Sequence, residues 1–210
     1  MSVYTIEESN SVIKNVCVYG LNESILRAKY PMSVSPDSLN DELTKGISSL
    51  AAASPGTGHD QFLSGIIVQF DLTFTIKAWT EFQRYHFTDF VSSQSTIHRI
   101  SRFDLDQQYI EYVDPRIIDI MKDKVVRYNN YISQESYDPE VARNLYLELL
   151  YSNPCGLKLT AGITTNYRQL KTMYHQRKNH KLNEWREFCQ FLKKLPHSEF
   201  ITGEFDNSMN

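Results

Sequence analysis

Residues 66–77 read IIVQFDLTFTIK, and this stretch decides the fold. Every second residue from Ile66 to Ile76 is apolar, and the residues between them are mostly polar. A period of two residues is typical of a β-strand with one buried face. After Lys77 the large side chains recur at spacings of three and four, which indicates an amphipathic helix: Trp79, Phe82, Tyr85 or His86, and Phe90. The sequence therefore predicts a long strand that leads directly into a helix.

The remaining segments predict helices packed on a sheet. Pro31 ends one helix, Asp138 and Pro139 fit the cap and first position of another, and Thr164 and Thr165 are suitable caps for the last. We therefore expect an α+β fold with a mostly antiparallel central sheet built around the strand at 66–76. At 210 residues the chain has the size of a single domain, with a frayed tail after about residue 201. The expected helices are Glu23–Tyr30, Leu43–Ala53, Ile117–Val126, Pro139–Tyr151 and, with a break, Asn166–Lys194.

Composition and charge exclude several classes of protein. The net charge of -3 argues against a nucleic-acid-binding surface over the whole protein. No apolar stretch approaches the roughly 20 residues that span a bilayer, and the N-terminal MSVYTIEESN lacks a signal pattern. Three widely separated cysteines fit a reducing compartment, and the six histidines lack acidic or cysteine neighbours at metal-ligand spacing. We expect a cytoplasmic protein with no membrane segment, no metal site and a small-molecule partner.

The familiar short catalytic motifs are absent, including the glycine-rich nucleotide loops and the G-x-S-x-G and H-E-x-x-H patterns. A cluster of polar residues instead follows the predicted strand and helix. Its uncharged donors and acceptors could bind the edge of a heterocycle, and the alternative is an ordinary hydrophilic loop. The cluster consists of Gln83, His86, Ser92, Ser93, Gln94, Ser95, Thr96, His98 and Arg99.

A second group of candidate residues makes the C-terminal segment locally basic: Arg168, Lys171, Arg177, Lys178, Lys181 and Arg186. Asn166 and Arg177 are eleven residues apart, so they share one stripe of a helix at a separation of about 16 Å. Only a long ligand could touch both. Arg168 lies at the expected helix start, where main-chain N–H groups favour an anion such as phosphate. The alternative is a solvated basic helix face.

Residues 166–177, NYRQLKTMYHQR, resemble a sequence pattern of the flavin-dependent thymidylate synthases. In that family N-x-R-x-L is followed by a second Arg nine residues after the first. Asn166, Arg168, Leu170 and Arg177 match this pattern in residue type and spacing.

Two further blocks resemble the same family, in the same order along the chain. Residues 58–74, GHDQFLSGIIVQFDLTF, are similar to its histidine and long central strand, which places His59 at a flavin-contacting position. Residues 82–100, FQRYHFTDFVSSQSTIHRI, correspond to a Gln followed by R-H-R-x-x-S-x-N-E-x-S-x-R-Y. This block departs from the family, because the two guanidinium groups of R-H-R and that of the last Arg are replaced, and neither His nor Thr offers the planar fork of donors that Arg has. With Gln83 aligned to the family's Gln, His86, Phe87 and Thr88 stand at R-H-R, Ser93 and Gln94 at N-E, Thr96 at the Ser and His98 at the last Arg, while Asn183 replaces a Gln of a later segment.

The resemblance implies a divergent, phage-type member of this family that forms a homotetramer. It implies FAD as cofactor, dUMP as the pyrimidine nucleotide that is methylated to dTMP, and methylenetetrahydrofolate and NADPH as cosubstrates. No residue is assigned a certain catalytic role. Two alternatives stay open: a flavin- or nucleotide-binding relative that acts on another pyrimidine, and a catalytically inactive binding protein on the same scaffold. The implied substrate contacts are Gln83, His86, Gln94, Thr96, His98 and Arg177, and the implied cofactor contacts are His59, Ser93, Asn166, Arg168 and Asn183.

Overall fold

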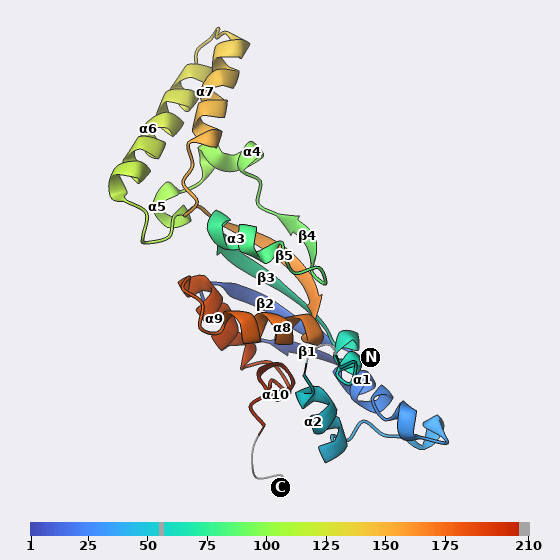
Figure 1. The fold of residues 1–210 in the computed structure, drawn as a ribbon. Coiled ribbons are helices and arrows are strands. Elements are labelled where there is room, and N and C mark those ends of the chain that lie inside the picture. The colour runs from blue at the N-terminus through green and yellow to red at the C-terminus, as the bar shows by residue number, and fades with distance from the viewer. Residues whose placement is uncertain (55–56, 206–210) are drawn as a thin grey trace. The chain divides into compact units, whose positions relative to one another are not determined.

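The computed structural model describes residues 1–54 and 57–205, and it has the predicted α+β composition of helices and an antiparallel sheet (Figure 1). The chain divides into two compact units. Unit 1 contains residues 1–72, 83–92 and the chain from 162 onward, and unit 2 contains residues 73–82 and 93–161. Each unit has its own set of buried side chains.

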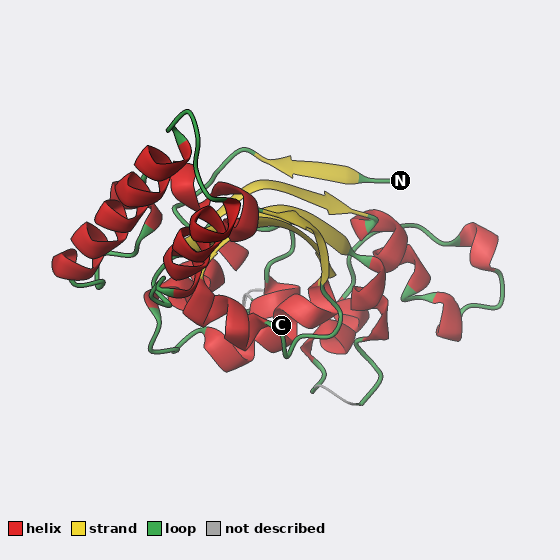
Figure 2. Ribbon diagram, turned by 90° about the horizontal axis from the view of Figure 1, so that it is seen from above, coloured by secondary structure: helices red, strands yellow, loops and turns green. Residues whose placement is uncertain are grey.

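The strands form one sheet in the order β1-β2-β3-β5-β4, which Figure 2 shows in yellow. The β1/β2 and β2/β3 pairs are antiparallel, and the β2/β3 register shifts between Lys14 and Cys17. Asn15 adopts a positive φ of 52° in this irregularity, and its side chain donates to Asp71 Oδ2 at 2.6 Å. The strands are β1 (Val3–Ile6), β2 (Ile13–Tyr19), β3 (Ile67–Thr75), β4 (Asp89–Ser93) and β5 (Lys158–Asn166).

Strand β3 confirms the predicted period of two. The side chains of Ile66, Val68, Phe70, Leu72 and Phe74 are all buried, and the residues between them are exposed or half-buried. The buried face removes large aliphatic and aromatic surfaces from water, which is the main favourable contribution to folding.

Helices α8 and α9 cover one face of the strands in unit 1 (Figure 1). Phe70 of β3 meets Phe188 of α9 with ring centroids 5.9 Å apart, and Phe188 in turn meets Trp185 at 5.9 Å. The helices of this unit are α1 (Leu21–Arg27), α2 (Lys45–Ala52), α8 (Tyr167–Arg177), α9 (Asn183–Leu192) and α10 (Glu199–Thr202), with short 3-10 turns η1 (Tyr30–Met32), η2 (Pro36–Ser38) and η3 (Gln61–Gly65).

Unit 2 contains a helical hairpin. The cap predicted at Asp138 is present, because its side chain accepts from the N–H of Glu140 at 2.8 Å. Asp114 caps the first helix of the hairpin in the same way and accepts from the N–H of Arg116 at 2.9 Å. Its buried core is formed by Ile100, Leu105, Tyr109, Met121, Leu149 and Leu157. Its helices are α3 (Ile76–Phe82), α4 (Thr96–Arg99), α5 (Leu105–Gln108), α6 (Pro115–Ile132) and α7 (Pro139–Tyr151), with the 3-10 turn η4 (Ile100–Arg102).

Two boundaries differ from the sequence prediction. Helix α3 ends at Phe82 and does not continue to Phe90, because the side chain of Tyr85 is buried in another cluster and Phe90 belongs to strand β4. Thr164 and Thr165 belong to strand β5 and are not helix caps. The sequence analysis did not predict this strand. The cap of α8 is Asn166, whose side chain accepts from the N–H of Gln169 at 2.9 Å.

The other predicted helices are present; α7 has the predicted bounds Pro139–Tyr151, and the others have shifted ends. The helix predicted at Glu23–Tyr30 is α1, and the one at Leu43–Ala53 is α2. In the predicted tail, Thr202 is buried and Glu204 accepts from Tyr174 at 3.0 Å, whereas positions 206–210 lie outside the described residues. None of the helices in the described part of the chain is both long and apolar enough to cross a membrane.

Replacement of Leu170 by Ala is expected to lower the free energy of unfolding by about 2 to 5 kcal/mol. Leu170 is fully buried in α8, so the change leaves a cavity. Urea denaturation measures the loss. The exposed Val141 of α7 gives the control, and Val141→Ala should stay within about 0.5 kcal/mol; equal losses in the two variants would contradict the observed burial.

Candidate functional site

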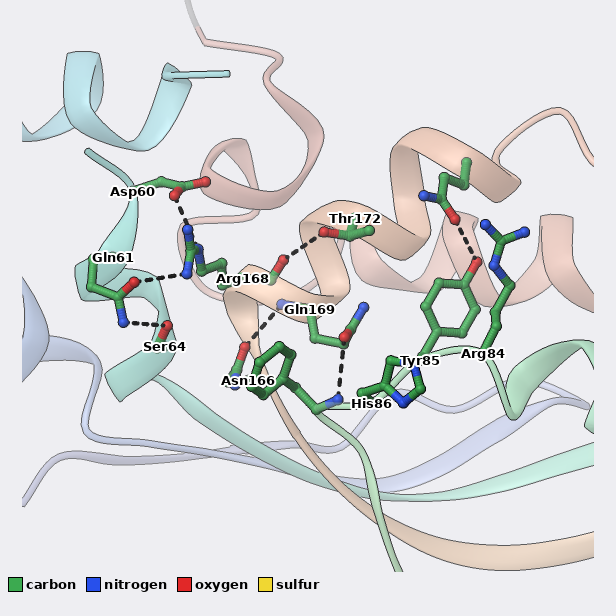
Figure 3. A pocket seen from close by; sticks show the side chains of 12 residues that line it. Asp60, Gln61, Ser64, Arg84, Tyr85, His86, Asn166, Arg168, Gln169 and Thr172 are labelled. Atoms are coloured by element: carbon green, nitrogen blue, oxygen red, sulfur yellow. Dashed lines mark hydrogen bonds and ion pairs between the residues drawn. The ribbon is translucent and has the colours of Figure 1, made fainter. Parts of the chain in front are cut away.

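A cavity of about 520 Å³ opens within unit 1. Its walls come from η3 with the preceding Asp60, from the segment 84–87, and from one side of α8 with its cap Asn166 (Figure 3). The volume lies in the range of small-molecule sites, which is roughly 300 to 1,000 Å³. Segments about a hundred residues apart in the sequence therefore form one cavity.

The buried carboxylate of Asp60 organises this cavity. Asp60 is 1% exposed, and its Oδ1 lies 3.1 Å from Arg168 Nε while its Oδ2 lies 3.0 Å from Lys171 Nζ. The Lys171 ammonium also donates to the carbonyl oxygens of Ala51 at 2.8 Å and Ala53 at 2.6 Å, at the end of α2. A buried charge is tolerated only when it is paired and hydrogen-bonded. The Asp60 carboxylate thus joins η3 to α8, and the Lys171 ammonium extends the network to the C-terminus of α2.

The wall of the cavity carries an excess of positive charge. Arg168 remains 32% exposed, and its Nη1 donates to Gln61 Oε1 at 2.7 Å. The exposed guanidinium of Arg84 lies 5.9 Å from the ring centroid of Tyr85, and the exposed His86 is its neighbour. Because Asp60 is already paired with two cations, the remaining charge favours an anionic ligand group.

Arg177 lies behind this cavity wall. It is 6% exposed, its Nε donates to the Tyr85 hydroxyl at 2.8 Å, and its guanidinium carbon lies 4.7 Å from the Trp185 ring centroid. Tyr85 in turn donates to Gln176 Oε1 at 3.1 Å. Arg177 therefore fixes Tyr85, which lines the cavity, and does not line the cavity itself. The alternative interpretation of the basic residues as a solvated helix face is wrong for Arg177 and Lys171, because both side chains are buried.

Three predicted site residues line the cavity: His86, Asn166 and Arg168. The others in unit 1 lie elsewhere. His59 is exposed beside Asp60, Gln83 is exposed after α3, and the side chain of Asn183 donates to Glu187 Oε1 at 2.7 Å. Their ligand roles, like that of Arg177, stay predictions.

The remaining predicted residues belong to unit 2: Ser93, Gln94, Thr96 and His98. Gln94 pairs with the backbone of Thr160, since its N–H donates to the Thr160 carbonyl at 2.9 Å and its Oε1 accepts from the Thr160 N–H at 2.8 Å. Thr96 and His98 lie in the short helix α4. Their contacts with substrate or cofactor also stay predictions.

Sequence reasoning missed Asp60, Tyr85 and Gln169, which all line the cavity. Each of them is the direct neighbour in sequence of a residue that was predicted to contact a ligand. Asp60 follows His59, Tyr85 precedes His86, and Gln169 follows Arg168. The sequence shows that these segments contain a carboxylate, a phenol and an amide. It does not show which of their side chains face the cavity.

Replacement of Asp60 by Asn is expected to destabilise the protein by about 3 to 5 kcal/mol, because it leaves the buried Lys171 ammonium without its counter-charge. Thermal and urea unfolding measure the loss. The matched control breaks the exposed pair of Lys77 and Glu81, and Lys77→Met should cost less than about 1 kcal/mol. A loss for Asp60→Asn as small as that of the control would show that the buried network is not important for stability.

Replacement of Arg177 by Ala is expected to cost at least about 2 kcal/mol of stability, because Tyr85 loses a donor and Trp185 loses its cation contact. Differential scanning calorimetry of Arg177→Ala and of the exposed-site variant Lys178→Ala gives the comparison. An Arg177→Ala protein that melts like the wild type would return Arg177 to the ligand-contacting role predicted from sequence.

No protein-family model and no curated protein matches this chain. Its fold is similar to solved structures, among them the flavin-dependent thymidylate synthase ThyX from Helicobacter pylori complexed with FAD and dUMP, with 14% identity, a TM-score of 0.61 and coverage of 97% of this chain and 98% of that one. A second structure of Thymidylate Synthase X from Helicobacter pylori with FAD and dUMP has 13% identity, a TM-score of 0.62 and coverage of 92% and 96%. The similarity extends over nearly the whole of both chains and shows that the fold is the one expected from sequence.

Proposed function

We propose that this protein binds FAD and a pyrimidine nucleotide and acts as a flavin-dependent thymidylate synthase that methylates dUMP to dTMP. One observation carries the proposal. The segments around residues 60, 86 and 168, which resemble this family in sequence, meet in a single cavity of suitable size. The whole-chain likeness to structures that contain FAD and dUMP supports the same proposal.

The residues in the cavity wall fit a flavin dinucleotide in their chemistry. FAD carries a pyrophosphate, which guanidinium groups bind well, and Arg84 and Arg168 supply two such groups. Amide groups suit its neutral polar edges, and the wall contains those of Asn166 and Gln169. Bound FAD would supply the redox chemistry of the reaction.

The protein's own residues bind and orient in this proposal. Arg168 would hold an anionic group while Asp60 and Gln61 fix its guanidinium, so the arginine is already oriented before a ligand arrives. Tyr85, held by Arg177, would form a rigid aromatic part of the wall. We further propose His59, Ser93 and Asn183 as additional flavin contacts, with methylenetetrahydrofolate and NADPH as cosubstrates.

The proposed nucleotide contacts are Gln83, His86, Gln94, Thr96 and His98. The assembly is proposed to be a homotetramer in the cytoplasm of a phage-infected cell.

The buried position of Arg177 favours a second candidate function. If this guanidinium stays packed against Trp185, it is not available to a nucleotide, and the pyrimidine site then differs from that of the family the sequence resembles. The second candidate is therefore a flavoprotein of the same fold that acts on a pyrimidine other than dUMP. Expression of the protein in a thymidine-requiring host distinguishes the two candidates. Only an enzyme that makes dTMP from dUMP should restore growth of this host without added thymidine.

The visible absorption spectrum tests the flavin proposal. Purified protein is mixed with FAD and passed through gel filtration, and oxidised-flavin bands should travel with the protein. Arg84→Gln should weaken FAD binding roughly tenfold to a hundredfold, the value of one charge-assisted hydrogen bond. Arg27→Gln, an exposed position of α1 away from the cavity, is the control. Folded wild-type protein that carries neither FAD nor dUMP would overturn the proposed function.

A further inference from the structure

Gln169 is a buried amide that faces the cavity and that the sequence pattern did not select. It lines the cavity, yet only 7% of its surface is exposed. Its backbone N–H is held by the Asn166 cap at 2.9 Å, in the first turn of α8. A polar side chain that is more than nine-tenths buried normally has its hydrogen-bonding capacity satisfied.

The side chain of Gln169 has one fixed orientation. Its Oε1 accepts from the backbone N–H of Phe87 at 3.4 Å. A backbone N–H can only donate, so the oxygen must face Phe87 and the amide nitrogen must point the other way. Figure 3 shows the Gln169 amide between helix α8 and the segment that contains Tyr85 and His86, with the oxygen on the dashed bond.

Within the described part of the chain, the amide nitrogen of Gln169 is a donor without a protein partner. Among residues 1–54 and 57–205 no side chain or carbonyl accepts from its Nε2. The nitrogen nevertheless retains accessible surface, since it is not among the fully enclosed polar atoms that lack a partner. When a ligand displaces water from the cavity, this fixed N–H donor loses its water partner. A ligand with a hydrogen-bond acceptor at this position therefore binds more favourably than one without it.

The side chain of Phe87 indicates the shape of that ligand. It lines the same cavity and is 71% exposed, so its ring offers a flat apolar surface. The backbone of this residue also orients the Gln169 amide. A planar ring with a carbonyl on its edge could use both features at once. Anionic groups have better partners in the Arg84 and Arg168 guanidiniums, which leaves the neutral amide for a neutral acceptor.

We infer that Gln169 is a specificity-determining residue whose Nε2–H donates to a ring carbonyl of the bound ligand. This inference rests on the proposed function and names its partner chemistry. The acceptor is a carbonyl of the cyclic imide edge, –CO–NH–CO–, which uracil and the isoalloxazine ring share. Gln169 selects ligands that present a carbonyl at this position over analogues that present an N–H donor there, since two donors cannot pair.

The test compares two variants. Gln169→Glu keeps an acceptor for the Phe87 N–H but removes the donor, and Gln169→Met removes the donor without adding charge. Gln190→Glu, at an exposed position of α9, is the charge-matched control. Circular dichroism first establishes that each variant melts cooperatively. Titration calorimetry then measures affinity for FAD, riboflavin, dUMP and uridine; riboflavin and uridine lack phosphate, so repulsion of an anionic ligand cannot explain a loss.

We expect both Gln169 variants to bind one ring system at least tenfold more weakly, and Gln190→Glu to bind as the wild type does. Losses for FAD and riboflavin assign the carbonyl to isoalloxazine, and losses for dUMP and uridine assign it to uracil. Variants that bind all four ligands within twofold of wild type overturn the inference and leave the proposed function in place. Wild-type protein that binds none of the four overturns the proposed function and the inference with it.

A second measurement needs no variant and decides the question if both Gln169 variants fail to fold. In thiocarbonyl analogues of uridine and riboflavin, sulfur replaces one carbonyl oxygen on the ring, and sulfur is a weaker hydrogen-bond acceptor. The wild-type protein should bind the analogue with sulfur at the contacted position about tenfold more weakly than its parent. Equal affinity for every thiocarbonyl isomer overturns the inference.

Discussion

The Asp60 carboxylate is the constraint on which the cavity depends, because it holds two cations of one helix at the same time. Arg168 and Lys171 are three residues apart on α8, so their side chains leave the helix on the same side. A single buried acceptor between them therefore fixes the rotation of α8 about its own axis. The removal of these charges from water costs free energy, so the network contributes more to a unique arrangement than to net stability.

The far end of α8 is held by a different kind of contact. Arg177 lies over the indole of Trp185 and donates to the phenol of Tyr85, which ties α8 to α9 and to the segment before β4. Between the two ends, the apolar side chains of Leu170 and Met173 are fully buried. With both ends fixed by cations and the middle by apolar packing, the first turn of α8 presents its polar side chains to the cavity in one orientation.

The sequence predicted those features that depend on local periodicity. Strand β3 alternates over nine residues and was predicted at nearly its true bounds, and the Asp138 cap of α7 was correctly located because capping is a local interaction. Strand β5 was missed because it runs without a turn into α8, and its Thr164 and Thr165 suit a strand and a helix cap equally well.

Burial of charged residues could not be predicted in this way. Helical geometry placed Asn166 and Arg177 on one stripe, but the stripe does not reveal which neighbours face it. The partners of Arg177 include Tyr85, 92 residues away in the sequence, and those of Lys171 include Asp60, 111 residues away. Such pairs arise only when the tertiary fold brings the segments together, so a run of basic residues gives the same sequence signal whether it is solvated, buried or bound to a ligand.

The cavity also indicates how a site with fewer guanidinium groups could still discriminate between ligands. A positive charge attracts any anion, and this attraction weakens as the ionic strength rises. A fixed neutral donor instead stabilises only a ligand that has an acceptor at the correct position. In the motif that the chain resembles, arginines occupy positions that here hold His86, Thr88 and His98. If the cavity binds a heterocycle as proposed, attraction comes from Arg84 and Arg168 while selectivity comes from groups that the backbone itself orients, such as the Gln169 amide. Affinity for the phosphate-bearing ligands should then depend on salt, and the preference for one ring edge over another should not.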